Sequence, residues 1–185
     1  AKAVAAMDEY DLGAYAVLIR DLAATTGLRP LLLYSKQDDS RLMAAMAEAL
    51  PVGSYAAVNS KCMATYDGIL PILRDARFVI GGRYHTAVTA LAQATPVILL
   101  PANTHKNEGL ATMLGIELPV HGLADRRAIL AEAAALMQPG NGRADAIRGA
   151  LDTAAARQEA FAAYLERFIA GGGRELEGAL NRVVA

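Results

Sequence analysis

The chain has 185 residues, enough for one sizeable hydrophobic core or two small ones. Its hydrophobic fraction is 54% and its aromatic fraction only 5%, a balance that favours helices packed on a sheet over an all-β sandwich. The formal net charge of -1 excludes a global electrostatic attraction to nucleic acid or to an anionic membrane. The single cysteine excludes a disulfide within the chain, and no apolar run reaches the roughly 20 residues that span a bilayer.

Short apolar runs bounded by turn residues predict the strands. The most distinct runs begin at Pro30 and at Pro96, and their continuous apolar character is typical of buried parallel strands. In chain order, strands are expected at 30–35, more weakly at 54–58, then at 77–80, at 96–100 and as a short addition at 116–120.

Apolar residues at helical spacing predict the helices between these strands, and Gly27 and Gly115 supply two of the stops. In chain order, helices are expected over 9–26, in the segment that carries Leu42, Met46 and Leu50, and over 65–75, 83–94, 105–115, 124–137 and 143–170. This alternation predicts an α/β fold, a Rossmann-like parallel sheet flanked by helices, over 1–140. A helical tail over 141–185 packs on that domain or on a missing neighbour, because Phe161, Leu165 and Phe168 form an apolar stripe.

In an open parallel sheet, ligands bind beyond the carboxyl ends of the strands. Polar loops at 36–40, 81–85 and 102–107 meet this condition. The loop at 81–85 carries the strongest pattern, because Gly81 and Gly82 allow a tight turn and the helix that follows offers unpaired N–H groups. Arg83 adds donors suited to carboxylate or phosphate, and His85 can donate a hydrogen bond or move a proton. The loop therefore predicts an anion site.

Structural roles remain open for the same residues. Arg83 can pair with a nearby acid and His85 can cap the edge of the core, and we weigh these roles equally with the anion site. Lys106 opposes the dipole at a helix start, which makes sense beside an anionic ligand, although a lone lysine is usually just solvated. Asp38 can act in binding or only cap a helix, and His121 has no evident partner.

The common catalytic and binding motifs are missing from the sequence. It has no G-x-G-x-x-G after a strand, no P-loop and no G-x-S-x-G, so the usual support for dinucleotide oxidoreductases, P-loop ATPases and serine hydrolases is lacking. The three histidines and Cys62 show no metal-ligand spacing, and no basic and aromatic platform indicates nucleic-acid binding. We therefore expect no metal and no cofactor.

The order of motifs over residues 74–115 resembles the polysaccharide pyruvyl transferase family. The shared features are an aspartate-alanine pair, an apolar strand, an Arg-x-His element, an alanine-rich helix, a Pro-Val-Ile strand and a later lysine followed by Gly-Leu and Leu-Gly. Here they are Asp75-Ala76, 77–80, Arg83-Tyr84-His85, 86–94, Pro96-Val97-Ile98, Lys106, Gly109-Leu110 and Leu114-Gly115. The weaker resemblance extends over about 10–120 and includes the loop with Asp38.

This resemblance implies transfer of a pyruvyl group from phosphoenolpyruvate to a sugar hydroxyl, with ketal formation, in cell-surface polysaccharide biosynthesis. It implies that His85 is the general acid or a phosphate contact, that Arg83 binds the donor anion, and that Lys106 neutralises a second anionic group. Gly81, Gly82 and Asp38 complete the implied binding set. The implied fold is one half of a glycosyltransferase-B-like enzyme, and we expect the acceptor site to lie in an N-terminal half outside this chain.

The implied partners are the phosphoenolpyruvate donor and a saccharide or lipid-linked saccharide acceptor. The expected location is the cytoplasm, with contact to the membrane face through the acceptor. Two alternatives stay open: a nucleotide-sugar-dependent glycosyltransferase domain of the same fold type, and a non-catalytic half-domain that dimerises or binds a partner through its helical tail.

Overall fold

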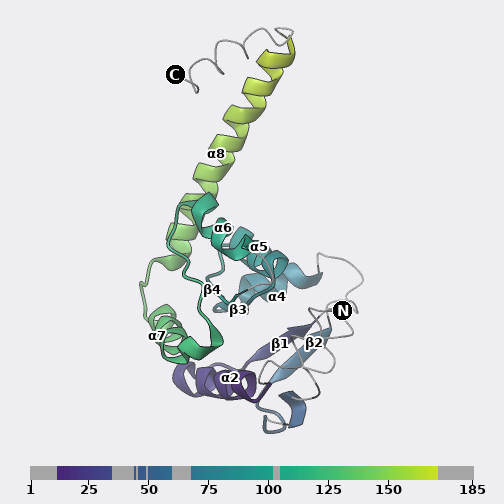
Figure 1. Ribbon diagram of the computed structural model, residues 1–185, viewed down its shortest axis with the longest axis vertical. Coiled ribbons are helices and arrows are strands. Elements are labelled where there is room, and N and C mark those ends of the chain that lie inside the picture. Colours follow the sequence, from purple (N-terminus) through teal and green to yellow (C-terminus); the bar gives the residue numbers. More distant parts are fainter. Residues whose placement is uncertain are drawn as a thin grey trace. The chain divides into compact units, whose positions relative to one another are not determined.

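The computed structural model describes residues 12–34, 44, 46–48, 50–59, 68–101 and 105–170. By its internal contacts the chain divides into two compact units, Ala1–Ile147 and Arg148–Ala185. Figure 1 labels the helices and strands of both units. The expected domain boundary, between residues 140 and 141, precedes the long helix α8 (Arg143–Ala170), whereas the division by contacts falls within it.

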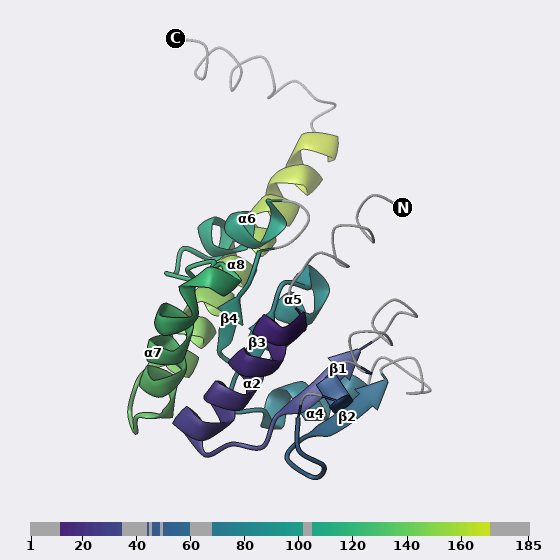
Figure 2. The same cartoon turned by 60° about the horizontal axis from the view of Figure 1, so that its bottom comes forward.

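The first sheet pairs β1 (Leu31–Tyr34) with β2 (Ala56–Asn59) in parallel, and Leu31 lies opposite Ala56. It follows α2 (Leu12–Thr26), which ends where Gly27 adopts a left-handed φ of 68°, a conformation that glycine reaches without steric cost. Figure 2 shows the two strands as a separate pair of arrows. This sheet is only partly covered, since the Leu31 side chain is 41% exposed.

The second sheet forms the buried centre of the first unit. It pairs β3 (Val79–Gly81) with β4 (Val97–Leu99) in parallel, and α5 (Tyr84–Ala92) makes the crossover between them. All residues of β4 are buried. A continuous apolar strand of this kind is typical of a sheet that is covered on both faces.

Helices cover the faces of this second sheet (Figure 1). The helices α2 and α7 (Arg126–Met137) pack together and contact the side chains of Ile98 and Leu100. Successive residues of a strand point to opposite faces, so Val97 and Leu99 face the other way. Helix α5 contacts β3, β4 and two further helices, α4 (Ile69–Asp75) and α6 (Lys106–Leu114).

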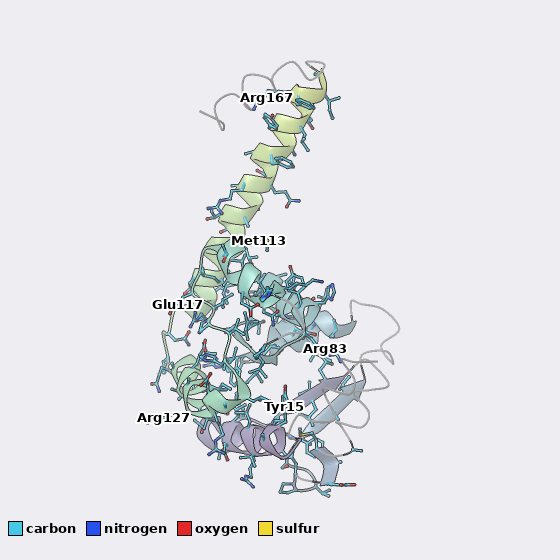
Figure 3. The ribbon with its side chains drawn as sticks, viewed as in Figure 1. Tyr15, Arg83, Met113, Glu117, Arg127 and Arg167 are labelled. Atoms are coloured by element: carbon cyan, nitrogen blue, oxygen red, sulfur yellow. The ribbon has the colours of Figure 1, made fainter. Side chains whose placement is uncertain are left out.

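Tyr15 connects the buried clusters beneath the two sheets, and Figure 3 labels it on α2. On one side it packs against the cluster that contains Leu18 and Ile98, and on the other against the cluster of Ala16, Met46 and Leu50. One helix thus supports both sheets, although the strands of the two sheets do not pair among the described residues.

The structure confirms a mixed α/β fold with parallel strands and a helical C-terminal region. The expectation of one continuous sheet is wrong in detail, because the described strands form two sheets of two strands each. The strand expected at 116–120 is reduced to a single parallel bridge between Leu99 and Val120. Pro119 supplies a physical reason, since it has no N–H group with which to extend a ladder.

Candidate functional site

Two turns meet at the carboxyl edge of β3 and β4. The N–H group of Leu100 donates a hydrogen bond of 3.1 Å to the carbonyl oxygen of Gly81, so both strands end at the same level. The first turn leads through Gly82 and Arg83 into α5, and the second leads from Pro101 toward α6. The sequence-based expectation that these two loops share one edge is therefore met by the described residues.

Gly82 lies at the closest approach between the two turns. A Cβ atom at this position would come within 2.4 Å of the carbonyl oxygen of Pro101, far inside van der Waals contact, whereas a Cβ at Gly81 would meet nothing within 4 Å. Neither glycine has a positive φ. The sequence predicts that the glycines serve a tight turn and a ligand, and the structure shows that the backbone of Pro101 requires glycine at position 82.

Arg83 and His85 both lie at the start of α5 and both are exposed. Arg83 precedes the helix in an extended conformation, and its side chain does not cap the helix N-terminus. Figure 3 labels Arg83 at this end of α5. The His85 ring packs edge-on against its neighbour Tyr84, with 5.6 Å between the ring centroids and 78° between the planes. The first N–H groups of α5 have no acceptor within the helix, as at any helix start, which favours an anion.

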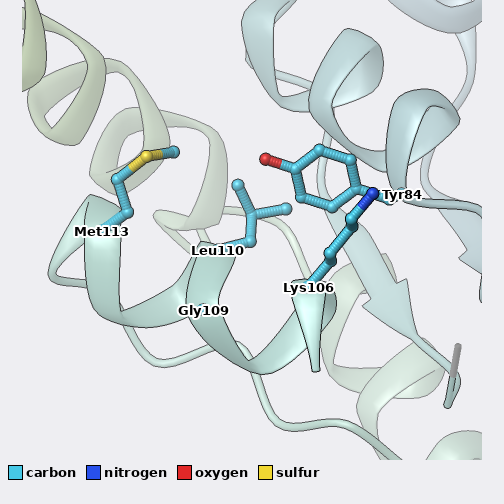
Figure 4. Close-up of a pocket in the computed structure, with 5 residues that line it drawn as sticks. All are labelled: Tyr84, Lys106, Gly109, Leu110 and Met113. Carbon is cyan, nitrogen blue, oxygen red and sulfur yellow. The ribbon is translucent and has the colours of Figure 1, made fainter. Parts of the chain in front are cut away.

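Lys106 begins α6, and its ammonium group reaches back to α5. The Nζ atom lies 5.8 Å from the centroid of the Tyr84 ring, within the range of a cation–π contact. Figure 4 shows the lysine chain extending beside this ring. The structure therefore brings Lys106 close to Tyr84, which lies between Arg83 and His85 in the sequence.

The same two helices enclose a shallow, open hollow of about 210 Å³. Tyr84, Lys106, Gly109, Leu110 and Met113 line it, and Figure 4 shows these residues. Because pockets for drug-sized ligands usually occupy about 300–1,000 Å³, this hollow is suited to a compact ligand or to one part of a larger ligand.

A buried asparagine, which the sequence patterns did not indicate, links the two turns. The side-chain amide nitrogen of Asn107 donates hydrogen bonds to the carbonyl oxygens of Leu100 at 2.9 Å and Gly82 at 3.2 Å. The residue is fully buried although its neighbours Lys106 and Glu108 are exposed. Asn107 lies three and seven residues before the buried Leu110 and Leu114, and this helical spacing is the sequence signal that could have placed it on the buried face of α6.

His121 does have a partner, contrary to the expectation from sequence. Its Nε2 atom lies 2.6 Å from Oε2 of Glu132 on α7, and both side chains are largely buried. The other carboxylate oxygen of Glu132 lies 3.4 Å from Nη2 of Arg143, whose Nη1 donates to the carbonyl oxygen of Glu117. The N–H group of His121 also bonds the carbonyl oxygen of Leu99 at the end of β4. This network fixes the segment after α6 to α7.

One exposed ion pair lies just before β3. The Arg74 guanidinium donates a hydrogen bond of 2.9 Å to Asp75, and this bond lowers the pKa of the Asp75 carboxyl. Both side chains are exposed, so water screens the pair and its contribution to stability is small.

Asp38, the remaining residue of the predicted site, lies outside the described residues, as do Cys62, Asn103 and Thr104. Within the described part of the chain, no group of three or more His, Cys, Asp or Glu side chains is arranged to hold a metal ion. In the same residues no helix is both long and apolar enough to cross a membrane. Comparison with known proteins found no matching family model, no matching curated protein and no matching solved structure.

Proposed function

We propose that the turn after β3 and the start of α6 form the donor site of a polysaccharide pyruvyl transferase. The observation that carries the proposal is the contact between Lys106 and the Tyr84 ring, because it adds a second cation to the helix start that bears Arg83 and His85. Phosphoenolpyruvate carries a carboxylate and a phosphate, and two cations beside two helix N-termini suit two anionic groups.

The chemistry requires an acid next to the donor. In the proposed reaction, His85 delivers a proton to the methylene carbon of phosphoenolpyruvate, which leaves an oxocarbenium-like centre at the carbon that bears the phosphate. One sugar hydroxyl bonds to this centre and returns a proton to His85. A second hydroxyl then displaces the phosphate, which leaves with the electrons of its carbon–oxygen bond and takes up the proton of that hydroxyl, and the product is a cyclic ketal. Arg83 and Lys106 bind the carboxylate and the phosphate through these steps.

The exposure of His85 supports its role as the acid, since a residue that contacts both donor and acceptor must be accessible to them. We further propose that this α/β region is one half of a glycosyltransferase-B-like enzyme, and that the other half binds the saccharide acceptor. The expected location is the cytoplasm, where phosphoenolpyruvate is made.

The competing donor is a nucleotide sugar. The hollow of about 210 Å³ beside Lys106 accommodates a compact ligand such as phosphoenolpyruvate or one part of a nucleotide sugar, so its volume is compatible with either donor. A thermal-shift experiment separates the two donors: we expect phosphoenolpyruvate to raise the melting temperature and uridine diphosphate to leave it unchanged. The opposite result would contradict pyruvyl transfer and support the glycosyltransferase.

The second unit favours an additional function, self-association. On α8 Phe161 is 60% exposed and Leu165 is 39% exposed. Apolar or small residues recur at alternating steps of three and four, the spacing of a coiled-coil seam, with one polar interruption at Gln158. The seam comprises Leu151, Ala154, Gln158, Phe161, Leu165 and Phe168.

A second copy of α8 is the partner that fits this seam best. In an antiparallel pair, Phe168 would lie opposite Leu151, Leu165 opposite Ala154, and Phe161 opposite Gln158, so that in each layer a larger side chain meets a smaller one. A parallel pair would instead place like residues together, with Phe161 against Phe161 and Ala154 against Ala154. Light scattering after size exclusion tests the proposal: a dimer supports it, and a strict monomer at high protein concentration contradicts it.

A further inference from the structure

Asn107 is fully buried and uses both amide hydrogens in bonds to main-chain oxygens. Burial of a side-chain amide is costly unless its polar atoms are bonded, so a buried asparagine in this place needs a reason. Its Oδ1 atom is buried as well and has no hydrogen-bond partner among the residues that the structure describes. The two carbonyl oxygens fix the orientation of the side-chain amide. If the amide were flipped, Oδ1 would lie against two other oxygens that cannot donate a hydrogen bond to it.

The two acceptors of Asn107 occupy matching places in the sheet. Leu100 follows the last residue of β4, and Gly82 follows the last residue of β3. The carbonyl of Gly82 belongs to the peptide bond that leads into Arg83. The amide of Asn107 thus fixes the orientation of that peptide and, with it, the start of α5.

The position of Asn107 in α6 gives this contact a consequence for the proposed site. It directly follows Lys106, the residue that supplies the second cation. One side chain therefore ties the turn with Arg83 and His85 to the helix turn with Lys106, across 25 residues of sequence. The hydrogen bond from Asn107 to Gly82 therefore helps to set the distance between Arg83 and Lys106. This distance matters because a shift of about 1 Å in a binding group can abolish its hydrogen bonds to a ligand.

We infer that Asn107 is a positioning residue, which holds the turn at 82–85 in register with the start of α6 so that both cations meet one anionic ligand. The inference rests on the proposed function for the identity of that ligand. The positioning role is supported by the two hydrogen bonds of the Asn107 amide and by the close approach of Gly82 to Pro101.

Asn141 provides a matched control in the same chain. Its side-chain amide also donates to two carbonyl oxygens, those of Leu136 at 2.9 Å and Gln138 at 3.0 Å, but it does so at the end of α7. The substitution Asn141→Asp removes the same kind of donor at an exposed residue whose Oδ1 accepts the N–H of Arg143, so it controls for loss of the donor, while Asn107→Ala controls for burial of a new charge. A general effect of losing two amide–carbonyl hydrogen bonds would appear in both variants, whereas a positioning role changes exchange over 79–88 and affinity only at Asn107.

The experiment compares Asn107→Asp, Asn107→Ala and Asn141→Asp with the unaltered protein, under conditions in which urea unfolding shows each to be folded. Hydrogen exchange is measured for peptides over 79–88, and phosphoenolpyruvate binding is measured by calorimetry. We expect both Asn107 variants to exchange at least about tenfold faster over 79–88 and to bind at least about tenfold more weakly. Asn141→Asp changes neither quantity. The alanine variant covers the case in which the buried charge of Asn107→Asp prevents folding.

The two measurements separate failure of the inference from failure of the proposed function. Unchanged exchange over 79–88 in the Asn107 variants overturns the inference, and so does faster exchange with unchanged affinity. If the unaltered protein binds no phosphoenolpyruvate, the proposed function fails, and the exchange data alone then decide whether Asn107 holds the turn.

Discussion

The side-chain amide of Asn107 donates a hydrogen bond of 3.2 Å to the carbonyl oxygen of Gly82, from the first turn of α6 to the turn before α5. This bond joins the two places where the sequence puts its strongest anion-binding residues. The geometry of the candidate site thus depends on Asn107, an uncharged residue that would not contact the ligand. Substitutions in and around the site test this dependence.

Gly82→Ala should destabilise the protein by about 1–3 kcal/mol, the usual cost of forcing an extra methyl group into a packed site. The new Cβ would lie 2.4 Å from the main-chain oxygen of Pro101, which cannot move without shifting the end of β4. Gly81→Ala is the control, because its Cβ would meet nothing within 4 Å, and it should cost less than about 1 kcal/mol. Urea unfolding measures both, and equal costs would contradict the close approach.

Lys106→Met should weaken phosphoenolpyruvate binding by about tenfold or more while leaving the free energy of unfolding nearly unchanged. The substitution keeps much of the apolar stem beside Tyr84 and removes the charge. The control Arg127→Met removes an exposed cation from α7 and should leave affinity unchanged. Calorimetric titration checks both, and an equal loss in the control would show that only the net charge matters.

The carboxyl group introduced by Asn107→Asp should make stability depend on pH. In the folded state this group would be buried against two carbonyl oxygens, which raises its pKa above the unfolded value of about 3.9. The folded state then binds the proton of this carboxyl more tightly than the unfolded state does. The free energy of unfolding therefore falls as pH rises from the unfolded pKa to the folded pKa. The loss of unfolding free energy relative to the unaltered protein is therefore smallest below about pH 4 and grows toward neutral pH. Urea unfolding across this range measures it, and a deficit that does not vary with pH would contradict the buried placement.

Glu132→Gln should cost about 1–3 kcal/mol of stability, because it removes the charge that His121 and Arg143 share in a largely buried place. Asp21, a half-buried carboxylate beside the exposed Arg20 and Arg126, is the control, and Asp21→Asn should cost less than about 1 kcal/mol. Denaturant unfolding of the two variants gives the comparison. Similar small costs for both would indicate that the Glu132 network is as weak as a surface ion pair.

Phe161→Ser should convert a dimer into a monomer, since this ring forms a central layer of the proposed α8 pair and is 60% exposed within one chain. The control Arg157→Ser alters the same helix next to the seam without removing an apolar layer. Light scattering over a range of concentrations measures the mass. A Phe161→Ser protein that remains a dimer would place the interface elsewhere.

Much of the fold could be predicted from local patterns. The helices and strands lie close to their expected places, and Gly27 and Gly115 end their helices in the left-handed conformation expected of such stops. The division into two sheets could not be predicted, because it depends on which strands meet in space rather than on the pattern within each strand. Likewise, the strand at 116–120 was expected from apolar composition, but Pro119 limits it to one bridge.

The candidate site was predictable only in its charged residues. Arg83, His85 and Lys106 stand out because they follow apolar strands, and topology alone places them at one edge. Asn107 looks like an ordinary polar residue in a polar loop, and the pairing of His121 with Glu132 depends on the packing of α7. Helical spacing from Leu110 and Leu114 could have placed Asn107 on the buried face of α6, but the partners of both residues depend on tertiary packing and could not be predicted from the sequence.

The most direct test of the central claim is a calorimetric titration of the protein with phosphoenolpyruvate, repeated with the double variant Arg83→Ala and Lys106→Met. The account predicts saturable binding at one site per chain, weakened at least about a hundredfold in the double variant, because two charge-assisted contacts are lost. Absence of binding to the unaltered protein, or equal affinity in the double variant, would contradict a phosphoenolpyruvate site at the ends of β3 and β4.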